Sequence, residues 1–388
     1  MSAGGSHLRH HRRHDSPTLR GTPDAMLKHR FRSRALVVLA AIPLLGLLAA
    51  CGGDAAAGGS AAAGGEGGTA DSLRLGHFAN VTHAAAIVGI DEGFIPEALG
   101  ETTLETQVFN AGPAVVEALF AGAIDASYIG PNPAINAYGQ SDGEAIRIIA
   151  GATSGGAQLV VRDGIDSVED LRGTTLATPQ LGNTQDVALR AWLTEEGLEN
   201  SVAGGGDVTI SPTPNADTLQ LFQAGEIDGA WLPEPWASRL VLEAGAEVFL
   251  DEAALWPDGR FVTTQLVVRT EFLEEYPGTV EALLRGHVEA VKWVGANPEE
   301  ASAVVNDGID TLTGQPLGDD VLGRSWENLE VTVDPVASSL AESAADAFVA
   351  GTAEEEVDLG GIYDLSALNA ILAEQGLTAV SAGGLGKE

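Results

Sequence analysis

Polar and aromatic side chains gather at four places where a short apolar segment is followed by a helix-like segment. In open α/β sheets, small molecules bind beyond the carboxyl ends of the strands, where helices begin. We therefore predict that these four loops form one binding site. Two residues that follow a further strand, Thr153 and Ser154, are predicted to belong to the same site. The predicted ligand-binding residues are Asn80, Thr82 and His83; Gly130 and Asn132; Thr153 and Ser154; Gly182, Asn183, Thr184 and Gln185; and Trp231, Glu234 and Trp236.

The segment Gly182-Asn183-Thr184 is predicted to bind an anion, because it offers backbone N–H groups together with an amide and a hydroxyl at the start of a helix. The loop around Gly130 is predicted to act similarly, although Pro131 and Pro133 each lack an N–H donor. The structural alternative for Asn183 and Thr184 is that they only cap their helix.

The two tryptophans of the last loop, Trp231 and Trp236, are predicted to form flat walls for an organic group. Their alternative is a place in the apolar core. For His83 the alternative is packing at a helix start. Glu234 does not suit an anion site, and it is expected to bond a backbone amide or an amine of the ligand instead.

The sequence contains none of the common catalytic or metal-binding motifs. It has no GxGxxG or GxxxxGK[ST] phosphate loop, no HExxH and no Gly-x-Ser-x-Gly. Residues 51–388 contain only three histidines, at 77, 83 and 287, and a single cysteine. We therefore predict no catalytic residue, no metal site and no cofactor.

The composition is that of an acidic globular protein. Of 388 residues, 45% are apolar and 19% are charged, which excludes a disordered chain and allows two domains with their own cores. The net charge is −35, and residues 51–388 carry 53 acidic and only 12 basic side chains. A surface of this sign repels nucleic acid, so a nucleic-acid partner is excluded.

The first 50 residues have the pattern of a secretory signal. A basic stretch from Lys28 to Arg34 precedes the apolar run 35–50, which is too short to span a membrane and ends in Leu-Ala-Ala-Cys. This ending resembles the bacterial lipobox, so Cys51 is predicted to carry a lipid and to begin the mature chain. The alternative is an incidental thiol. The start of translation is either Met1 or Met26.

Residues 51–70 are almost entirely glycine and alanine and are predicted to be a flexible tether. The chain would then be held at the outer face of the cell membrane by its lipid. From residue 71 onward, short apolar strands alternate with helical periodicity, which predicts two α/β lobes.

The sequence contains an internal repeat. The segment 121–133 (AGAIDASYIGPNP) has a counterpart at 224–235 (AGEIDGAWLPEP), and QLVVR at 158–162 recurs at 265–269. Two matches at nearly equal spacing indicate two related lobes, with the QLVVR strands predicted to be the two crossings between them. The predicted first lobe is 71–160 plus 265–388, and the second is 161–264.

These segments, together with FANVTHAAAIVG (78–89), ATPQLGNTQDVALRAWL (177–193) and DLGGIYDLSALN (358–369), resemble the nitrate/sulfonate/taurine (NitT/TauT, SsuA-like) family of ABC-importer binding lipoproteins. The resemblance implies the type II periplasmic-binding-protein fold, with two α/β lobes joined by two crossover strands. It further implies a monomer that is not an enzyme, closes on a sulfonate or taurine-like solute and delivers it to a membrane permease with its ATPase.

Other ligands and roles remain open at this point. Nitrate is disfavoured, because the nitrate branch of the family has a His in the motif occupied here by Asn183 and Thr184. A thiamine pyrimidine precursor is the alternative solute, and a sensory rather than transport role would use the same clamp. A more remote alternative is a thiamine-pyrimidine synthase-like enzyme, whose cysteine-rich motif is missing because the one cysteine is Cys51.

Overall fold

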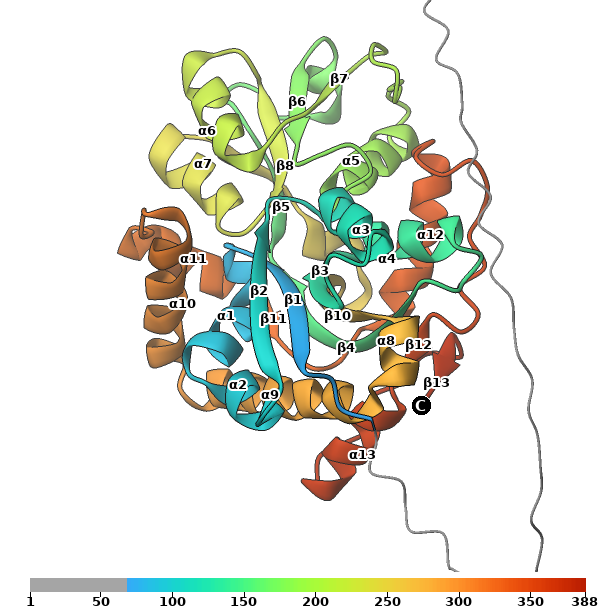
Figure 1. The fold of residues 1–388 in the computed structure, drawn as a ribbon. Helices are drawn as coiled ribbons and strands as arrows, with labels where there is room; N and C mark the ends of the chain where they lie inside the picture. Colours follow the sequence, from blue (N-terminus) through green and yellow to red (C-terminus); the bar gives the residue numbers. More distant parts are fainter. Residues whose placement is uncertain (1–67) are drawn as a thin grey trace, which may run out of the picture. The chain divides into compact units, whose positions relative to one another are not determined.

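Two β-sheets organise the computed structural model, which describes residues 68–388 (Figure 1). The larger sheet has the order β13 (Gly386–Lys387), β12 (Tyr363–Asp364), β4 (Ile146–Gly155), β10 (Val262–Arg269), β3 (Ala126–Ile129), β1 (Ser72–Phe78), β2 (Thr103–Phe109), and β11 (Leu329–Val331) pairs with β4. The smaller sheet has the order β7 (Thr209–Pro212), β6 (Thr175–Thr178), β8 (Gly229–Pro233), β5 (Ala157–Val161), β9 (Glu247–Asp251). We call each sheet with its helices a lobe, the larger being the first lobe.

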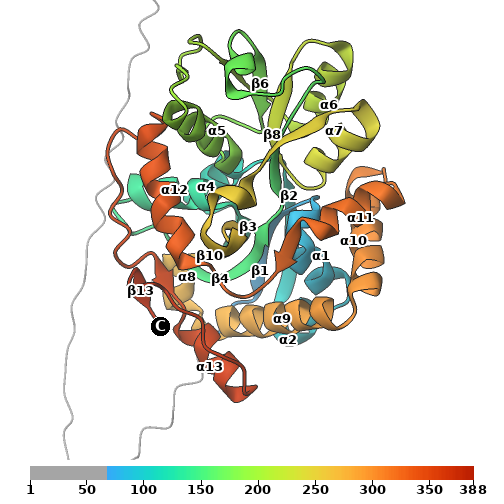
Figure 2. The same cartoon turned by 180° about the vertical axis from the view of Figure 1, so that it is seen from behind.

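Helices pack on both lobes, as Figures 1 and 2 show from opposite sides. In the first lobe they are α1 (Ala84–Asp91), α2 (Phe94–Leu99), α3 (Gly112–Phe120), α4 (Pro131–Gln140), α8 (Thr270–Glu275), α9 (Pro277–Ala296), α10 (Pro298–Thr313), α11 (Asp319–Glu327), α12 (Ala337–Val349) and α13 (Ser366–Glu374). In the second lobe they are α5 (Thr184–Glu195), α6 (Asn215–Ala224) and α7 (Trp236–Ala244). Helices of the first lobe also reach the second, because α11 packs against α7, and α12 and α4 pack against α5.

The internal repeat of the sequence is a repeat of sheet topology. In both lobes the strand bearing the QLVV motif is antiparallel to its two neighbours. It is the fourth strand of its sheet, counted from the edge strand β2 in the first lobe and from the edge strand β7 in the second. The register is also the same, since Gln265 faces Ile129 in the first lobe and Gln158 faces Leu232 in the second. The prediction of two related α/β lobes is confirmed.

The repeated Ala-Gly-x-Ile-Asp segment has the same function in both lobes. Asp125 accepts a hydrogen bond from the backbone N–H of Arg74 (3.0 Å), and Asp228 accepts one from the backbone N–H of Thr175 (2.8 Å). Each aspartate therefore fastens the turn before one parallel strand to the start of its neighbour. The Ala-Gly-x-Ile-Asp segment recurs in the sequence because both lobes need this aspartate bond.

The two crossings lie a few residues earlier than expected. The chain leaves the first lobe at Gly155 and Gly156, both of which have positive φ angles of 77° and 78°, so a residue with a side chain would be strained there. It returns between β9 and β10, through residues 252–261. The boundaries predicted at 160 and 265 cut through β5 and β10, whereas each of these strands lies wholly within one sheet. The QLVVR segments therefore follow the crossings rather than form them.

Five strands were not predicted from the sequence: the edge strands β2 and β9, and the strands β11, β12 and β13, which have only two or three residues each. β2 lies at the edge of its sheet, and most of its residues are exposed. An edge strand with polar residues on both faces lacks the apolar signal by which buried strands are recognised. β9 is likewise an edge strand and has no fully buried residue.

The predicted signal segment, Cys51 and most of the tether lie outside the described residues. Among residues 68–388, no helix combines the length and the apolar character that a membrane crossing requires.

Candidate functional site

A cavity of about 410 Å³ lies between the lobes and is the candidate binding site. Its walls come from strand ends and helix starts of both lobes, as expected for this class of fold. The first lobe contributes Ala79, Asn80, Phe109, Asn110, Ile309, Thr313, Gln315 and Leu317, and the second contributes Pro214, Asn215, Ala216, Leu219, Gln220, Pro235, Trp236 and Arg239.

A smaller recess of about 20 Å³ shares Asn80, Asn110 and Asn215 with this cavity. Half of the predicted ligand-binding residues meet here, drawn from three separate loops. The recess is lined by Asn80, Thr82, His83, Gly130, Asn183, Thr184 and Gln185 of the predicted set, and by Phe78, Asn110, Pro179, Asn215, Pro233, Thr263 and Thr264.

Several helices of nine or more residues, among them α3, α4, α5, α6 and α7, begin in or beside these two spaces. Free N–H groups and the aligned peptide dipoles make helix starts favourable places for negative charge. No aspartate or glutamate is among the residues lining either space, and Arg239 is the only lysine or arginine there. In a chain with 55 acidic residues, a cleft of this composition favours an anion or a neutral polar molecule.

The backbone of the first lobe approaches the second closely where Gly130, before α4, meets Thr184, at the start of α5. A Cβ atom on Gly130 would lie 2.4 Å from Thr184 Oγ1, so only glycine allows this approach. The hydroxyl of Thr184 is buried and has no hydrogen-bond partner among residues 68–388. It is therefore available to donate to a bound molecule.

Asn183 connects the lobes instead of capping its own helix. Its side-chain oxygen accepts a hydrogen bond of 3.2 Å from the backbone N–H of Gly112, the first residue of α3. It makes no side-chain capping bond to α5. The capping alternative for Asn183 is therefore wrong, and its amide nitrogen contacts Gln185 Oε1 at 3.3 Å.

Trp236 also joins the lobes, since its indole N–H donates to Asn80 Oδ1 over 3.0 Å. The guanidinium of Arg239 lies over the indole, 4.8 Å from the ring centroid, a distance typical of a cation–π contact. Glu243 accepts three hydrogen bonds of 3.1–3.2 Å from Arg239, but it does not line the cavity. Arg239 is thus held beside the cavity by both neighbours.

The buried imidazole of His83 lines the recess without carrying a charge. Its ring stacks on Phe78 with the centroids 4.3 Å apart, and its Nδ1 accepts a hydrogen bond from the Phe78 backbone N–H at 3.3 Å. Burial, with a smaller effect of His77, lowers the pKa of His83 well below its usual value. The carbonyl of Thr82 accepts a hydrogen bond of 2.7 Å from the Thr153 hydroxyl, which fixes this loop from behind.

Trp231 does not form a wall of the cavity, so this prediction is wrong. It is fully buried in the core of the second lobe, where its ring lies edge-on to Trp192 with centroids 6.0 Å apart. Its indole N–H donates to Glu252 at 2.7 Å. Side chains alternate along β8, and Trp231 points to the face covered by α5 rather than to the cleft.

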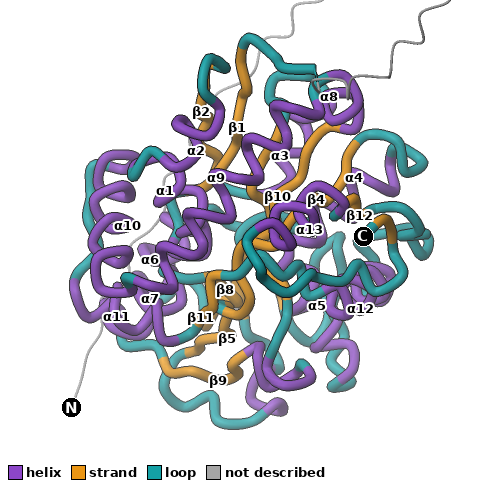
Figure 3. The backbone as a smooth tube through the Cα atoms, turned by 90° about the horizontal axis from the view of Figure 1, so that it is seen from below, coloured by secondary structure: helices purple, strands orange, loops and turns teal. Residues whose placement is uncertain are grey.

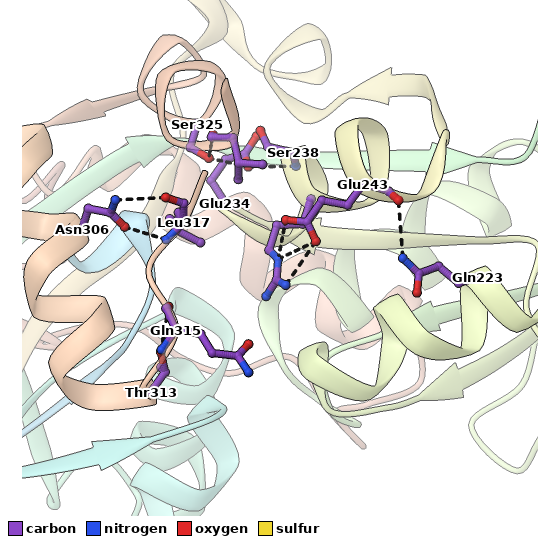
Figure 4. Close-up of polar contacts among 11 residues, drawn as sticks. Gln223, Glu234, Ser238, Glu243, Asn306, Thr313, Gln315, Leu317 and Ser325 are labelled. Carbon is purple, nitrogen blue, oxygen red and sulfur yellow. Dashed lines mark hydrogen bonds and ion pairs between the residues drawn. The ribbon is translucent and has the colours of Figure 1, made fainter. Parts of the chain in front are cut away.

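Glu234 binds the other lobe, not the cavity (Figure 4). Its buried carboxylate accepts hydrogen bonds from Arg324 (3.2 Å), Asn328 (2.7 Å) and Ser325 (3.2 Å), all of the first lobe. It also accepts the backbone N–H of Ser238 at 3.0 Å. The expected bond to a backbone amide is therefore present, whereas a contact with a ligand amine is not available.

The remaining predicted residues support the site without lining it. Asn132 donates to the carbonyl of Ser343 at 2.8 Å and, with Gly182, lines a separate small space beside α12. Thr153 and Ser154 lie in the pairing region of β4, where Ser154 faces Val262 and Glu330. These four residues are parts of the framework. Thr153 and Ser154 were predicted to follow a strand, but they lie within β4, which continues to Gly155.

Several lining residues were missed in the sequence. Asn110 follows the unrecognised strand β2, and Asn215 begins α6 after a predicted strand, so the strand-end rule applies to both. Thr313 is the last residue of α10 and Gln315 follows this helix, more than 70 residues beyond the last predicted site residue. No local pattern distinguishes them, since only the packing of α10 and α11 beside the second lobe brings them to the cavity (Figure 3).

Curated proteins similar to this chain are bacterial binding proteins. The taurine-binding periplasmic protein of Escherichia coli is 27% identical over 216 residues, which cover 55% of this chain and 64% of that protein. The "Putative aliphatic sulfonates-binding protein" of Bacillus subtilis is 24% identical over 349 residues, covering 88% and 97%. The chain thus matches somewhat less than two thirds of the first relative's length.

Solved structures of such proteins share the fold. The alkanesulfonate-binding protein SsuA from Xanthomonas axonopodis, bound to MOPS, aligns with a TM-score of 0.61 at 20% identity over 74% of this chain and 96% of its own. The nitrate-binding protein NrtA from Synechocystis aligns with a TM-score of 0.64 at 17% identity, covering 80% and 90%. The predicted type II periplasmic-binding fold is confirmed. The model of the NMT1-like family matches residues 66–306, more than half of the chain, which therefore belongs to that family.

Proposed function

We propose that this chain is the solute-binding subunit of an ABC importer and binds an aliphatic sulfonate or a taurine-like organic anion. It would work outside the cytoplasm as a monomer and would not be an enzyme. The relatives described above, named for binding taurine and aliphatic sulfonates, support this reading.

The observation that carries the proposal is the composition of the cleft. The helices α3, α4, α5, α6 and α7 begin in or beside it, Arg239 is the only lysine or arginine in its lining, and no carboxylate lines it, whereas the chain as a whole is strongly acidic. The sulfonate group would bind at the start of α5, where the free hydroxyl of Thr184 points into the recess. The apolar side chains of Leu219, Ile309 and Leu317 would contact its carbon chain.

Closure of the two lobes is the proposed mechanism of capture. Asn183–Gly112, Asn80–Trp236 and Glu234–Arg324 are contacts that only closed lobes can make. A solute that touches both lobes stabilises the closed state by its additional contacts and shifts the equilibrium toward it. The two crossings, at residues 155–156 and 252–261, would act as the hinge.

Delivery follows from the proposed class. The closed form would dock on a membrane permease whose ATPase supplies the energy, and the lipid on Cys51 with the tether 51–70 would keep the protein near it. The lobes would comprise residues 71–156 plus 262–388 and residues 157–261, respectively.

A neutral heterocycle, such as a thiamine pyrimidine precursor, is the second candidate. It is favoured by the amides of Asn80, Asn110, Asn215, Gln220 and Gln315, which can pair with ring nitrogens and exocyclic amines without any charge.

A ligand screen by thermal shift tests the proposal. The panel contains alkanesulfonates, taurine, nitrate, bicarbonate and thiamine pyrimidines, added to the purified full-length chain. A ligand at 100 times its dissociation constant stabilises the folded state by about 2.7 kcal/mol, enough to raise the melting temperature by a few degrees. Arg239→Gln should weaken sulfonate binding, whereas Arg285→Gln, at an exposed ion pair, should not. A shift with pyrimidines alone would support the second candidate, and no shift with any sulfonate would refute the first.

A further inference from the structure

The larger cavity is poorly suited to a positive charge, because its lining contains no carboxylate and its aromatic residues are only Phe109 and Trp236. An ammonium group in a protein is usually paired with a carboxylate or placed over an aromatic face. No aspartate or glutamate lines the cavity. The indole face of Trp236 is already covered by the guanidinium of Arg239, which would repel a second cation.

The nearby carboxylates are also engaged elsewhere. Glu243 binds Arg239 through both of its oxygens, and Glu234 is buried against Arg324, Ser325 and Asn328. Neither glutamate is among the lining residues. A solute with an ammonium group would therefore lose the hydration of that charge and find only neutral acceptors and the Phe109 ring, with no carboxylate to pair with it.

The loop between α10 and α11 presents an uncharged hydrogen-bonding group instead. Asn306 fixes this loop by two bonds, accepting from the Leu317 N–H (2.7 Å) and donating to the Leu317 carbonyl (3.0 Å). The hydroxyl of Thr313 contacts both the N–H (3.2 Å) and the carbonyl (3.1 Å) of Gln315. The backbone of Gln315 is thus held from both sides.

The side-chain amide of Gln315 lines the cavity and makes no hydrogen bond to another residue in the described part of the chain. Figure 4 shows it extending away from the loop into the space between the lobes. A primary amide can both donate and accept, so it suits a hydroxyl, ether or amide group of the ligand. The loop belongs to helices that have no counterpart in the topology of the second lobe.

We propose that the site selects organic sulfonates whose far end is an uncharged hydrogen-bonding group over those that end in an ammonium, and that Gln315 is a specificity-determining residue for this choice. The proposal rests on the sulfonate-binding function proposed above and narrows it. Taurine would be a weak ligand of this chain, although it is the ligand named for one relative.

Matched pairs of ligands test the proposal. Calorimetric titration of the full-length chain with ω-hydroxy- and ω-amino-alkanesulfonates of two, three and four carbons compares an uncharged with a cationic end at constant length. We expect the hydroxy member to bind at least tenfold more tightly in the best-binding pair. Gln315→Glu, which replaces the amide by a carboxylate of the same shape, should reduce or invert that ratio by at least tenfold.

Gln140→Glu is the control, because Gln140 is an exposed glutamine of α4 that bonds Asn136 and does not line the cavity. It adds the same charge and should leave the ratio unchanged. The specificity proposal is overturned if the amino member binds as tightly as the hydroxy member, or if Gln315→Glu leaves every ratio unaltered. Failure of all six sulfonates to bind would instead refute the proposed function, and the specificity proposal with it.

Discussion

Glu234 of the second lobe and Arg324 of the first form an ion pair across the cleft, with 3.2 Å between Oε1 and Nη1. The glutamate is fully buried and the arginine is 20% exposed. The same guanidinium donates to Ser238 at 2.7 Å and to Gln158 at 2.6 Å, so it binds three residues of the second lobe. This cluster closes the cavity on the side of α7 and α11 without lining it.

Replacing Arg324 by alanine should weaken solute binding by at least tenfold while changing the unliganded stability little. Removing one partner of a buried charge pair is costly only in the closed state, because opening returns Glu234 to water. Calorimetry gives the affinity, and small-angle scattering at saturating ligand should show a larger radius of gyration than for the wild type. Arg285→Ala, at an exposed ion pair, is the control. Equal affinity in both variants would contradict this role.

Gly130→Ala should block closure. The new Cβ would lie 2.4 Å from Thr184 Oγ1, while the φ angle of −71° at Gly130 causes no strain for alanine. Affinity should fall by tenfold or more, and the melting temperature without ligand should change little.

Combining Gly130→Ala with Thr184→Ala separates a steric from a chemical effect. The double variant removes Oγ1, so it should close again and recover part of the affinity lost by Gly130→Ala. Thr184→Val, which keeps the volume but removes the unpartnered hydroxyl, should lower affinity without lowering stability, since a buried polar group without a partner is itself unfavourable. Unchanged affinity in Thr184→Val would remove this hydroxyl from the binding site.

Stability should decrease as the pH rises from 5 to 7.5, partly because of Glu252. Burial raises the pKa of Glu252 to about 7, and the charges of Asp346 and Asp251 contribute. The pKa of Asp346 is also raised to about 7, by burial and by Glu195 and Glu342. These carboxyls bind protons more tightly in the folded than in the unfolded state. Their stabilising contribution is therefore complete only below the ordinary pKa of each group, 4.5 for Glu252 and 3.8 for Asp346, and is lost as the pH rises through 7.

Chemical denaturation at several pH values measures this effect in the wild type and in Glu252→Gln. A difference of one in pKa corresponds to about 1.4 kcal/mol. Between pH 5 and pH 7.5, we therefore expect the free energy of unfolding of the wild type to fall by roughly 2 kcal/mol more than that of Glu252→Gln. The amide can still accept the hydrogen bond of Trp231. Identical pH dependence of the two proteins would show that Glu252 is not protonated near neutrality.

Cys51→Ser should abolish lipid attachment. The prediction rests on the sequence alone, since Cys51 lies outside the described residues. Metabolic labelling with an alkyne fatty acid in a bacterial host should mark the wild type and not the variant, and the variant should move from the membrane to the soluble fraction. Labelling that persists in Cys51→Ser would disprove the lipobox.

The sequence alone determined the elements and their repeat. Alternating apolar segments identified the buried strands, because strands covered on both faces consist of apolar residues. The repeat of AGxID and QLVV corresponds to two sheets of equal topology, since the same turns and registers need the same residues. Polar loops at strand ends correctly brought Asn80, Gly130 and Thr184 to one recess.

Only the tertiary structure decided the direction of each side chain and the contacts between distant segments. Trp231 lies in β8 and Trp236 begins α7, but one enters the core and the other faces the cavity, because α5 packs on the face of β8 to which Trp231 points. Glu234 binds Arg324 across 90 residues of sequence. Gln315 reaches the cavity only because α10 and α11 pack beside the second lobe. Such contacts result from the packing of whole elements, which no local pattern of residues encodes.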